Sequence, residues 1–344
     1  MEIRQVALVE TEADPWGFSV PIMDAFKHAG YPCDYITPAV DTNLDQYSAL
    51  ILYGPMRSIT SLVERFKREL DQSKVVLWFT EQLPSPNASK PLQTLLAQTR
   101  YLIQSTLETD RLLNSTSLHR IVTPFLKRSG RLRAVGEAIT LYDNHLLAFL
   151  SVFTKRHACF FQANHIPARV IPMGYHPLFG RDLHLEKDID VLFIGSTVDR
   201  RRRTILHQLR EWYADQGVRF VIFDGSPENG FVFGKRRMEM LNRARIFINI
   251  FRQPWDDPTF RLLLAGANHT MLLSEKVDSS SRGPFEANVH FGECELGCLG
   301  EQTLEYLAHP AEIERITRAN AEYIRQDLTM DRQVRKIIAR LKRI

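Results

Sequence analysis

Short apolar runs alternate with amphipathic segments along most of this 344-residue chain. Apolar runs ended by turn residues are typical of buried strands, and apolar residues spaced three and four apart are typical of helices. This alternation predicts parallel sheets covered by helices, because parallel strands need a crossover between them. The expected strands of the first half are 6–9, 33–37, 49–53, 75–80, 146–150 and 168–172. Those of the second half are 191–194, 220–223, 246–249 and 271–274.

The length of the chain and the break between the two series predict two domains. Proline and glycine are frequent at the break, at Pro172, Gly174, Pro177 and Gly180. The predicted fold class is α/β, with two Rossmann-like, doubly wound domains that face each other across a cleft. We assign 1–180 to the N-terminal domain, 181–325 to the C-terminal domain and 326–344 to a basic C-terminal helix. Packing of that helix back on the N-terminal domain is one arrangement open to it.

Composition favours a globular protein of the reduced, cytoplasmic class. The net charge of +4 does not by itself indicate a nucleic-acid partner. The sequence has no segment of transmembrane length and no apolar signal-peptide core at its start. Cys33 and Cys159 lie in apolar stretches and are predicted to be core residues. Cys294 and Cys298 have no second ligand pair at zinc-finger spacing, so no metal site is predicted.

The junction after the first strand of the second half carries the strongest functional signal. The stretch 188–203 runs through an apolar strand into Gly195-Ser196 and then into four consecutive arginines that begin a helix. A strand, a tight turn and a helix N-terminus form a favourable anion site, and arginine forks match phosphate oxygens. Since adjacent residues cannot share one helix face, one or two arginines are expected to contact phosphate. The alternative is a solvated charged face.

The second half resembles glycosyltransferases of the GT-B fold, in particular the branch related to spore-maturation-protein-B-like enzymes. The resemblance covers about 165–325, and its pieces occur in the family's order. They are Val-Ile-Pro-Met-Gly-Tyr-His-Pro (170–177), Asp-Val-Leu-Phe-Ile-Gly-Ser (190–196), Leu-Asn-Arg-Ala-Arg-Ile-Phe-Ile-Asn-Ile (241–250), Pro-Thr-Phe-Arg-Leu-Leu-Leu-Ala-Gly-Ala (258–267), Met-Leu-Leu-Ser-Glu (271–275) and Leu-Glu-Tyr-Leu-Ala-His-Pro (304–310).

The resemblance implies a hexosyltransferase-like enzyme that moves a sugar from a nucleotide-sugar donor to an acceptor. The C-terminal domain would hold the donor, and the N-terminal domain would hold most of the acceptor, which is a sugar, lipid, protein or small molecule. Neither a metal nor a further cofactor is implied, because basic groups and a helix N-terminus neutralise the diphosphate. Inversion or retention of stereochemistry is not predicted, and neither is a nucleic-acid partner.

Candidate donor-binding residues lie at strand ends or in the loops after them. They are Gly195, Ser196, Arg201, Arg202, Arg203, Gly225, Asn249, Arg252, Asp256, Arg261 and Glu275. Two positions depart from the family pattern: Leu264 replaces a glutamate that contacts ribose or sugar, and His269 replaces a glycine. The leucine supports an alternative function, a catalytically weakened GT-B protein that binds a nucleotide, a glycan or a protein.

Candidate catalytic residues come from the first half. Glu10 and Asp14 lie in the acidic loop after the first strand, and Glu81 follows the fourth. Each carboxylate is a candidate base for an acceptor hydroxyl, and the alternative for each is an exposed loop residue. Three further residues are candidates for lining a cleft, of which Trp16 is expected to stack on a sugar ring. They are Trp16, Gly17 and His176.

Overall fold

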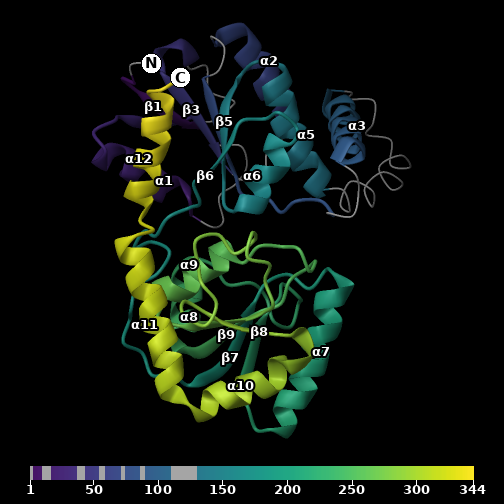
Figure 1. Cartoon of the computed structure of the whole chain (residues 1–344), viewed down its shortest axis with the longest axis vertical. Coiled ribbons are helices and arrows are strands. Elements are labelled where there is room, and N and C mark those ends of the chain that lie inside the picture. The colour runs from purple at the N-terminus through teal and green to yellow at the C-terminus, as the bar shows by residue number, and fades with distance from the viewer. Residues whose placement is uncertain are drawn as a thin grey trace. The chain divides into compact units, whose positions relative to one another are not determined.

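The computed structural model describes residues 3–9, 17–36, 43–53, 59–70, 74–85, 90–109 and 130–344. The chain divides into two compact units. Unit 1 contains Met1–Ala13, Ile22–Ile171 and Val334–Ile344, and unit 2 contains Asp14–Pro21 and Pro172–Gln333. Each unit has a sheet flanked by helices, as Figure 1 shows.

Unit 1 is built on a six-stranded parallel sheet with the order β2-β1-β3-β4-β5-β6. Its strands are β1 (Val6–Val9), β2 (Cys33–Ile36), β3 (Ala49–Tyr53), β4 (Val75–Phe79), β5 (Leu147–Val152) and β6 (Ala168–Val170). Its helices are α1 (Ser19–His28), whose first turn groups with unit 2, α2 (Ile59–Glu69), α3 (Lys90–Thr109), α5 (Gly130–Asp143) and α6 (Lys155–Gln162). Strands such as β4 are apolar throughout because helices cover both faces of the sheet.

Unit 2 is built on a five-stranded parallel sheet with the order β11-β10-β9-β7-β8. Its strands are β7 (Ile189–Ile194), β8 (Phe220–Phe223), β9 (Ala244–Asn249), β10 (Met271–Glu275) and β11 (Gly292–Cys294). Its helices are α7 (Arg200–Asp215), α8 (Gly234–Arg243), α9 (Thr259–Ala267), α10 (Leu299–Ala308) and α11 (Pro310–Gln326), after which α12 (Met330–Leu341) enters unit 1. The sequence did not predict β11, because its residues, Gly-Glu-Cys, do not form an apolar run.

Both sheets reverse their order of winding at one point, and these points locate the candidate sites. The order 2-1-3-4 places the reversal between β1 and β3 in unit 1 and between β7 and β9 in unit 2. In open parallel sheets, ligands bind outside the carboxyl ends of the strands at such a point. The α/β prediction with two doubly wound sheets is therefore confirmed, and the arginine-rich junction follows one of the two strands at the reversal.

The segment between the two sheets belongs to unit 2 from Pro172 onward, nine residues before the expected boundary after residue 180. Backbone hydrogen bonds explain this, since Tyr175 donates to the Leu328 carbonyl at 2.6 Å and accepts from the Met330 amide at 2.9 Å. The Asn268 side chain also donates to the Phe179 carbonyl at 3.1 Å. The segment is therefore fixed to unit 2 by its backbone.

Two predictions about individual side chains have different outcomes. The apolar face of the C-terminal helix is buried as predicted, at Val334, Ile337, Ile338 and Leu341. The prediction that Cys159 is a core residue is wrong. This thiol lies on the exposed side of α6, because the helix turns the neighbouring Phe160 and Phe161 toward the core instead.

Candidate functional site

The turn between β7 and α7 is the first part of the candidate site. The Gly195 amide is used inside the fold, where it donates to the Phe223 carbonyl at 2.9 Å. The carboxylate of Asp199 caps α7 and accepts from the backbone amides of Arg201 and Arg202 at 3.0 and 3.4 Å. This differs from the expectation of a helix N-terminus open to phosphate, because the protein supplies its own anion there. Any anion at this turn must be held mainly by side chains.

The four arginines of the first turn of α7 point in different directions. Arg200 and Arg203 are exposed, Arg201 is half-buried and Arg202 is buried, as the rotation of a helix requires. Only Arg201 and Arg202 contact the neighbouring loops, and both belong to the predicted set. Arg203, the third predicted member, lies on the solvent side of the helix.

Arg201 forms an ion pair with Glu275 at the end of β10. Its Nη1 and Nη2 donate to the two carboxylate oxygens of Glu275 at 3.0 and 2.5 Å, and Nη1 also donates to the Phe251 carbonyl. The hydrogen bonds and the charge of Glu275 raise the pKa of Arg201. Glu275 is buried and also accepts from the Phe251 amide. Both side chains therefore join α7, β10 and the loop after β9, which leaves them little capacity for a ligand.

Arg202 lies beneath the turn with its charge only partly compensated. Its Nε donates to the Ile250 carbonyl at 2.8 Å and its Nη1 to the Ser196 carbonyl at 3.0 Å. Its guanidinium carbon lies 5.6 Å from the centre of the Phe193 ring. Burial lowers the pKa of Arg202 to about 8, and the positive charges of Arg261 and Arg252 add to the effect. An arginine in such surroundings keeps its proton and favours an added anion.

Arg261 approaches the same turn from the first turn of α9. Its guanidinium carbon lies 5.5 Å from the Phe193 ring centre and 5.4 Å from that of Phe247. The buried Nη1 atom has no hydrogen-bond partner among the described residues. Burial, followed by the charge of Arg252, lowers the pKa of Arg261 to about 10. This side chain therefore offers hydrogen bonds that the protein leaves unused.

Gly195 makes room for the side chains of Arg202, which is buried, and Arg261, which is half-buried. A Cβ atom at this position would overlap with Nη2 of Arg261 and lie 3.3 Å from Nη1 of Arg202. The glycine therefore matters because side chains approach its Cα. The expected donation from its backbone to phosphate is not available, since the Phe223 carbonyl already accepts from the Gly195 amide.

Charge at the site is unbalanced once Arg201 and Glu275 are paired. Arg202, Arg252 and Arg261 remain, and the carboxylates near Arg202 are those of Asp256, which is buried and accepts from the Gln253 amide at 3.3 Å, and of Asp199, which caps α7. Arg252 is exposed, near buried Arg202 and half-buried Arg261. Three cations against two carboxylates, in a partly desolvated position, leave a net positive charge that favours an anion.

The loop after β8 forms a rigid neighbour to this turn. Asp224 accepts from the Thr197 hydroxyl at 3.1 Å, from the Ser226 amide at 3.0 Å and from the Asn229 side chain at 3.1 Å. Gly225 has a φ of +81°, and a Cβ there would overlap with the ring of Phe231. Two aromatic rings, Phe231 and Phe233, are 46% and 41% exposed, with centroids 5.9 Å apart. The loop therefore presents exposed aromatic surface on a fixed backbone.

The remaining candidates on the donor side have structural contacts. Asn249 is fully buried and donates to the Ser274 hydroxyl at 2.8 Å, so it joins the ends of β9 and β10 behind the arginines. The Ser196 hydroxyl accepts from the Val198 amide at 3.3 Å within the turn. Leu264 is buried in α9, one turn after Arg261 on the same side of the helix, and supplies no carboxylate.

The candidates from the first half are only partly described. Glu10, Asp14 and Trp16 lie outside the described residues. Gly17 has a φ of +75°, and the Glu81 carbonyl lies 3.1 Å from Nε2 of His157. His176 forms a local turn, in which its Nδ1 accepts from the Leu178 amide at 3.3 Å. Glu81 belongs to unit 1, and Gly17 and His176 belong to unit 2, so a joint role of these residues stays a prediction.

Several residues of the site were not predicted from the sequence. Phe193 and Phe247 support the guanidinium groups, and Asp199 and Asp224 order the two loops. The two phenylalanines look like ordinary strand residues in the sequence. The aspartates do carry a detectable signal, since each stands where a capping or turn residue is common.

The comparisons with known proteins identify the fold. Over 99% of its length the chain is similar to a sucrose-phosphate synthase from Thermosynechococcus elongatus, with 98% of that chain covered, 11% identity and a TM-score of 0.59. It is equally similar to HepE of Anabaena in complex with UDP and glucose, with 99% and 100% of the two chains covered, 8% identity and a TM-score of 0.60. The chain has the GT-B fold.

Sequence comparison adds a family match within the GT-B chain. Residues 196–339 match the family model described as glycosyl transferase-like. This range begins at Ser196 and contains α7, the loop after β9 and α9. No curated protein matches the chain significantly. The spore-maturation-protein-B-like branch stays a prediction.

The described residues contain neither a helix fit to cross a membrane nor a cluster of metal-ligating side chains. None of the helices described here is both long and apolar enough to span a bilayer. Among the same residues, no group of three or more His, Cys, Asp or Glu side chains has the arrangement of a metal site.

Proposed function

We propose that this GT-B protein transfers a sugar, of the hexose class, from a nucleotide-sugar donor to an acceptor. The observation that carries the proposal is the pair of guanidinium groups of buried Arg202 and half-buried Arg261, which face Gly195 and form no ion pair with a carboxylate of the described residues. The family match over 196–339 supports it, and so do GT-B neighbours whose structures contain UDP or UDP-glucose.

The diphosphate of the donor is assigned to Arg202, Arg261 and Arg252. Negative charge grows on the leaving nucleoside diphosphate as the glycosidic bond breaks, and fixed positive groups stabilise that charge in the transition state. Carbonyl oxygens hold Arg202 and phenylalanine rings support Arg261, so neither group must reorganise during the reaction. The positive charge of the arginines matches a diphosphate, and we therefore propose transfer without a metal ion or a further cofactor.

The nucleobase is assigned to the loop after β8. The exposed rings of Phe231 and Phe233 provide stacking surface, and a hydrogen bond from Thr197 to Asp224 attaches this loop to the turn between β7 and α7. For the acceptor side we retain Glu10, Asp14 and Glu81 as candidate bases, with Trp16, Gly17 and His176 as candidate contacts. The acceptor is a sugar, lipid, protein or small molecule.

One observation favours a second function, nucleotide binding without efficient transfer. Leu264 occupies the position of the family glutamate, and Glu275 is occupied by Arg201 and the Phe251 amide. Neither of these two family positions therefore offers a carboxylate to a ribose or sugar hydroxyl. A protein of this kind binds the diphosphate but turns over slowly.

Calorimetric titration without added metal tests the donor site. We would titrate the wild type with UDP, GDP, TDP and ADP and with their common sugar conjugates. We expect micromolar binding of one nucleotide, and at least tenfold weaker binding by Arg202→Met and Arg261→Met. Arg203→Met is the matched control, since this arginine is exposed on the same helix and its loss should leave the affinity unchanged.

The outcomes separate the possibilities. Absence of binding to every nucleotide, or equal affinity in all variants, would reject the proposed donor site. Binding together with sugar release or transfer would support the enzyme. Binding without any turnover over hours, with each candidate acceptor class supplied, would favour the nucleotide-binding protein.

A further inference from the structure

His269 occupies a backbone position that normally suits glycine. It follows α9 and the C-cap residue Asn268, and its φ is +51°. Residues with a Cβ atom are disfavoured in this left-handed region, which is why helices often end with glycine there. The contacts of the imidazole ring provide a reason for the histidine.

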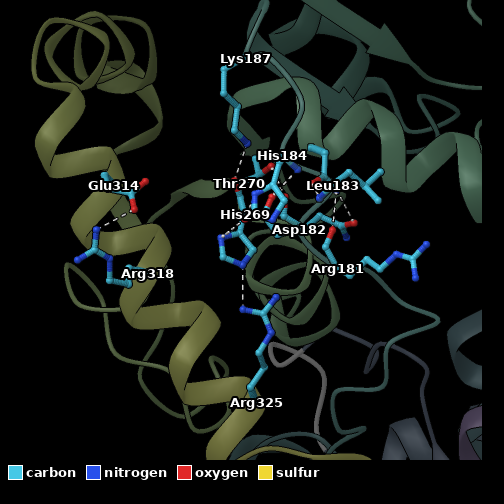
Figure 2. A network of polar contacts seen from close by, with 12 residues as sticks. Arg181, Asp182, Leu183, His184, Lys187, His269, Thr270, Glu314, Arg318 and Arg325 are labelled. Atoms are coloured by element: carbon cyan, nitrogen blue, oxygen red, sulfur yellow. Dashed lines mark hydrogen bonds and ion pairs between the residues drawn. The ribbon is translucent and has the colours of Figure 1, made fainter.

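The ring of His269 joins three segments of unit 2 (Figure 2). Nη1 of Arg325, on α11, lies 2.8 Å from Nε2 of His269. On the other side, Nδ1 lies 3.6 Å from a carboxylate oxygen of Asp182. The His269 carbonyl accepts from Nζ of Lys187, which also donates to the Ala244 carbonyl at 2.9 Å.

These partners determine which ring nitrogen carries the proton. A guanidinium group only donates, so Nε2 of His269 must accept from Arg325 and must be unprotonated. The proton of the neutral ring is therefore on Nδ1, which faces Asp182. Protonation of Nε2 would place an N–H group against the guanidinium group of Arg325, so the contact exists only with the neutral ring.

The contact lies at one end of the packing surface between α9 and α11. The Asn320 side chain of α11 donates to the Leu262 carbonyl of α9 at 3.0 Å. A Cβ atom at Gly266 would lie 2.8 Å from Cγ of Asn320, so the two helices pack closely there. Arg325 continues this surface and also lies over the ring of Tyr175, at 5.5 Å.

The charged groups around His269 favour the neutral ring. Burial is the largest cause that lowers its pKa, and the cations Arg325 and Lys187 lower it further, against the opposing anions Asp182 and Glu314. Glu314 is paired with Arg318 at 3.1 Å. The further groups nearby are exposed His184, 3.3 Å from Asp182, and Arg245 of β9, which lies near Lys187 and pairs with Asp190.

We propose that His269 and Arg325 form a pH-sensitive latch between α9 and α11. The latch is closed at neutral pH and opens when the ring of His269 takes up a proton. Because α9 also contains Arg261, about 12 Å away along the helix, opening the latch loosens the element that holds one diphosphate-binding arginine. This effect on the donor site rests on the proposed function, whereas the latch itself does not.

The titration of His269 tests the latch directly. Its ring signal in a protein labelled with ¹³C-histidine is identified as the one that disappears in His269→Asn. We expect Arg325→Gln to raise the pKa of His269, because a neighbouring cation is removed. His184→Asn is the matched control: His184 is exposed, has a φ of +52° and lies beside the same Asp182, but among the described residues Arg325 contacts His269 and Tyr175 and not His184. An unchanged titration in Arg325→Gln would overturn the latch.

Thermal unfolding and nucleotide affinity test its consequence. Because the pKa of His269 is lowered in the folded state, the unfolded chain binds this proton at a higher pH than the folded protein does. The stability of the wild type should therefore fall as the pH drops below about 6.5. We expect the melting temperature to drop by at least about 2 °C more between pH 7.5 and 5.5 in the wild type than in His269→Asn. Equal pH dependence in the two proteins would reject the latch.

The two proposals can fail separately. If no nucleotide binds at pH 7.5, the proposed function fails, while the ring titration still decides about the latch. If a nucleotide binds, its affinity should fall at least threefold more between pH 7.5 and 5.5 in the wild type than in His269→Asn. Parallel pH profiles would show that α9 does not transmit the protonation to the arginines, which would overturn that coupling.

Discussion

Replacing Arg261 with methionine should have opposite effects on stability and on ligand binding. In the absence of a ligand, the guanidinium group lies over Phe193 and Phe247 with an unused Nη1 atom, and burial and Arg252 lower its pKa. A methionine side chain preserves most of the apolar stem and removes the charge. If the arginine is present for an anion, its removal should not weaken the empty protein.

The magnitude follows from the two opposing contributions. The pKa of Arg261 is about 10, roughly 2.5 powers of ten below an ordinary arginine, and each power is worth about 1.4 kcal/mol. The charged group thus costs on the order of 3 kcal/mol before solvent screening. Loss of the two cation–π contacts offsets about 1–2 kcal/mol. We expect the variant to be equally stable or up to about 2 kcal/mol more stable.

The bound state should show the reverse. A charge-assisted hydrogen bond to a diphosphate is worth about 1.5–3 kcal/mol, so Arg261→Met should weaken binding about 10- to 150-fold. Urea unfolding measures the first effect, and titration with pyrophosphate or the preferred nucleotide measures the second. Arg203→Met, on the exposed side of α7, is the control for both. A loss of more than about 1 kcal/mol in the variant, with ligand affinity unchanged, would refute the reasoning, because it would make Arg261 a structural residue.

Three other perturbations probe the same unit. Gly195→Ala should displace the facing arginine and weaken nucleotide binding at least tenfold with the fold intact. The control is Gly297→Ala, whose Cβ has no heavy atom within 4 Å and which should leave the nucleotide affinity unchanged. Glu275→Gln breaks a buried ion pair and should cost about 2–4 kcal/mol in urea unfolding. The control is Glu295→Gln, which breaks the exposed ion pair of Glu295 with Lys276 and should cost less than about 0.5 kcal/mol. Equal costs of the two substitutions would contradict the assignment of Glu275 to a buried ion pair. Burial lowers the pKa of Lys187 to about 8, so the folded protein gives up this proton before the unfolded chain does. Unfolding free energy should therefore rise between pH 8 and 10 in the wild type, and Lys187→Met should flatten that rise.

The strands of the candidate site could be predicted because their pattern is local. An apolar run followed by Gly195-Ser196 indicates a buried strand and a turn in any α/β protein, and β7 ends one residue before this glycine. The position of the arginines in the first turn of a helix was also visible in the sequence. Helix periodicity further implied that four adjacent arginines point in different directions, as Arg202 and Arg203 do.

The partners of the charged residues could not be predicted. Arg201 and Glu275 are 74 residues apart in the sequence, and either could have faced a ligand. The helix start after Gly195-Ser196 was expected to offer its amides to phosphate, but the Asp199 carboxylate accepts from two of them. His269 looked like a departure from a family glycine, and nothing near it in sequence indicates Arg325.

The sequence by itself determined most of the strands of this protein, their alternation with helices and hence two parallel α/β sheets, because strand, turn and helix preferences depend on neighbours within a few residues. The tertiary structure decided which charges are neutralised within the protein and which remain for a ligand. That distinction depends on burial and on distances between groups from β7, β9, β10 and α9, which the order of winding brings to one edge of the sheet. Arg201 and Arg202 are neighbours in the chain, but only Arg201 faces a carboxylate at its guanidinium group.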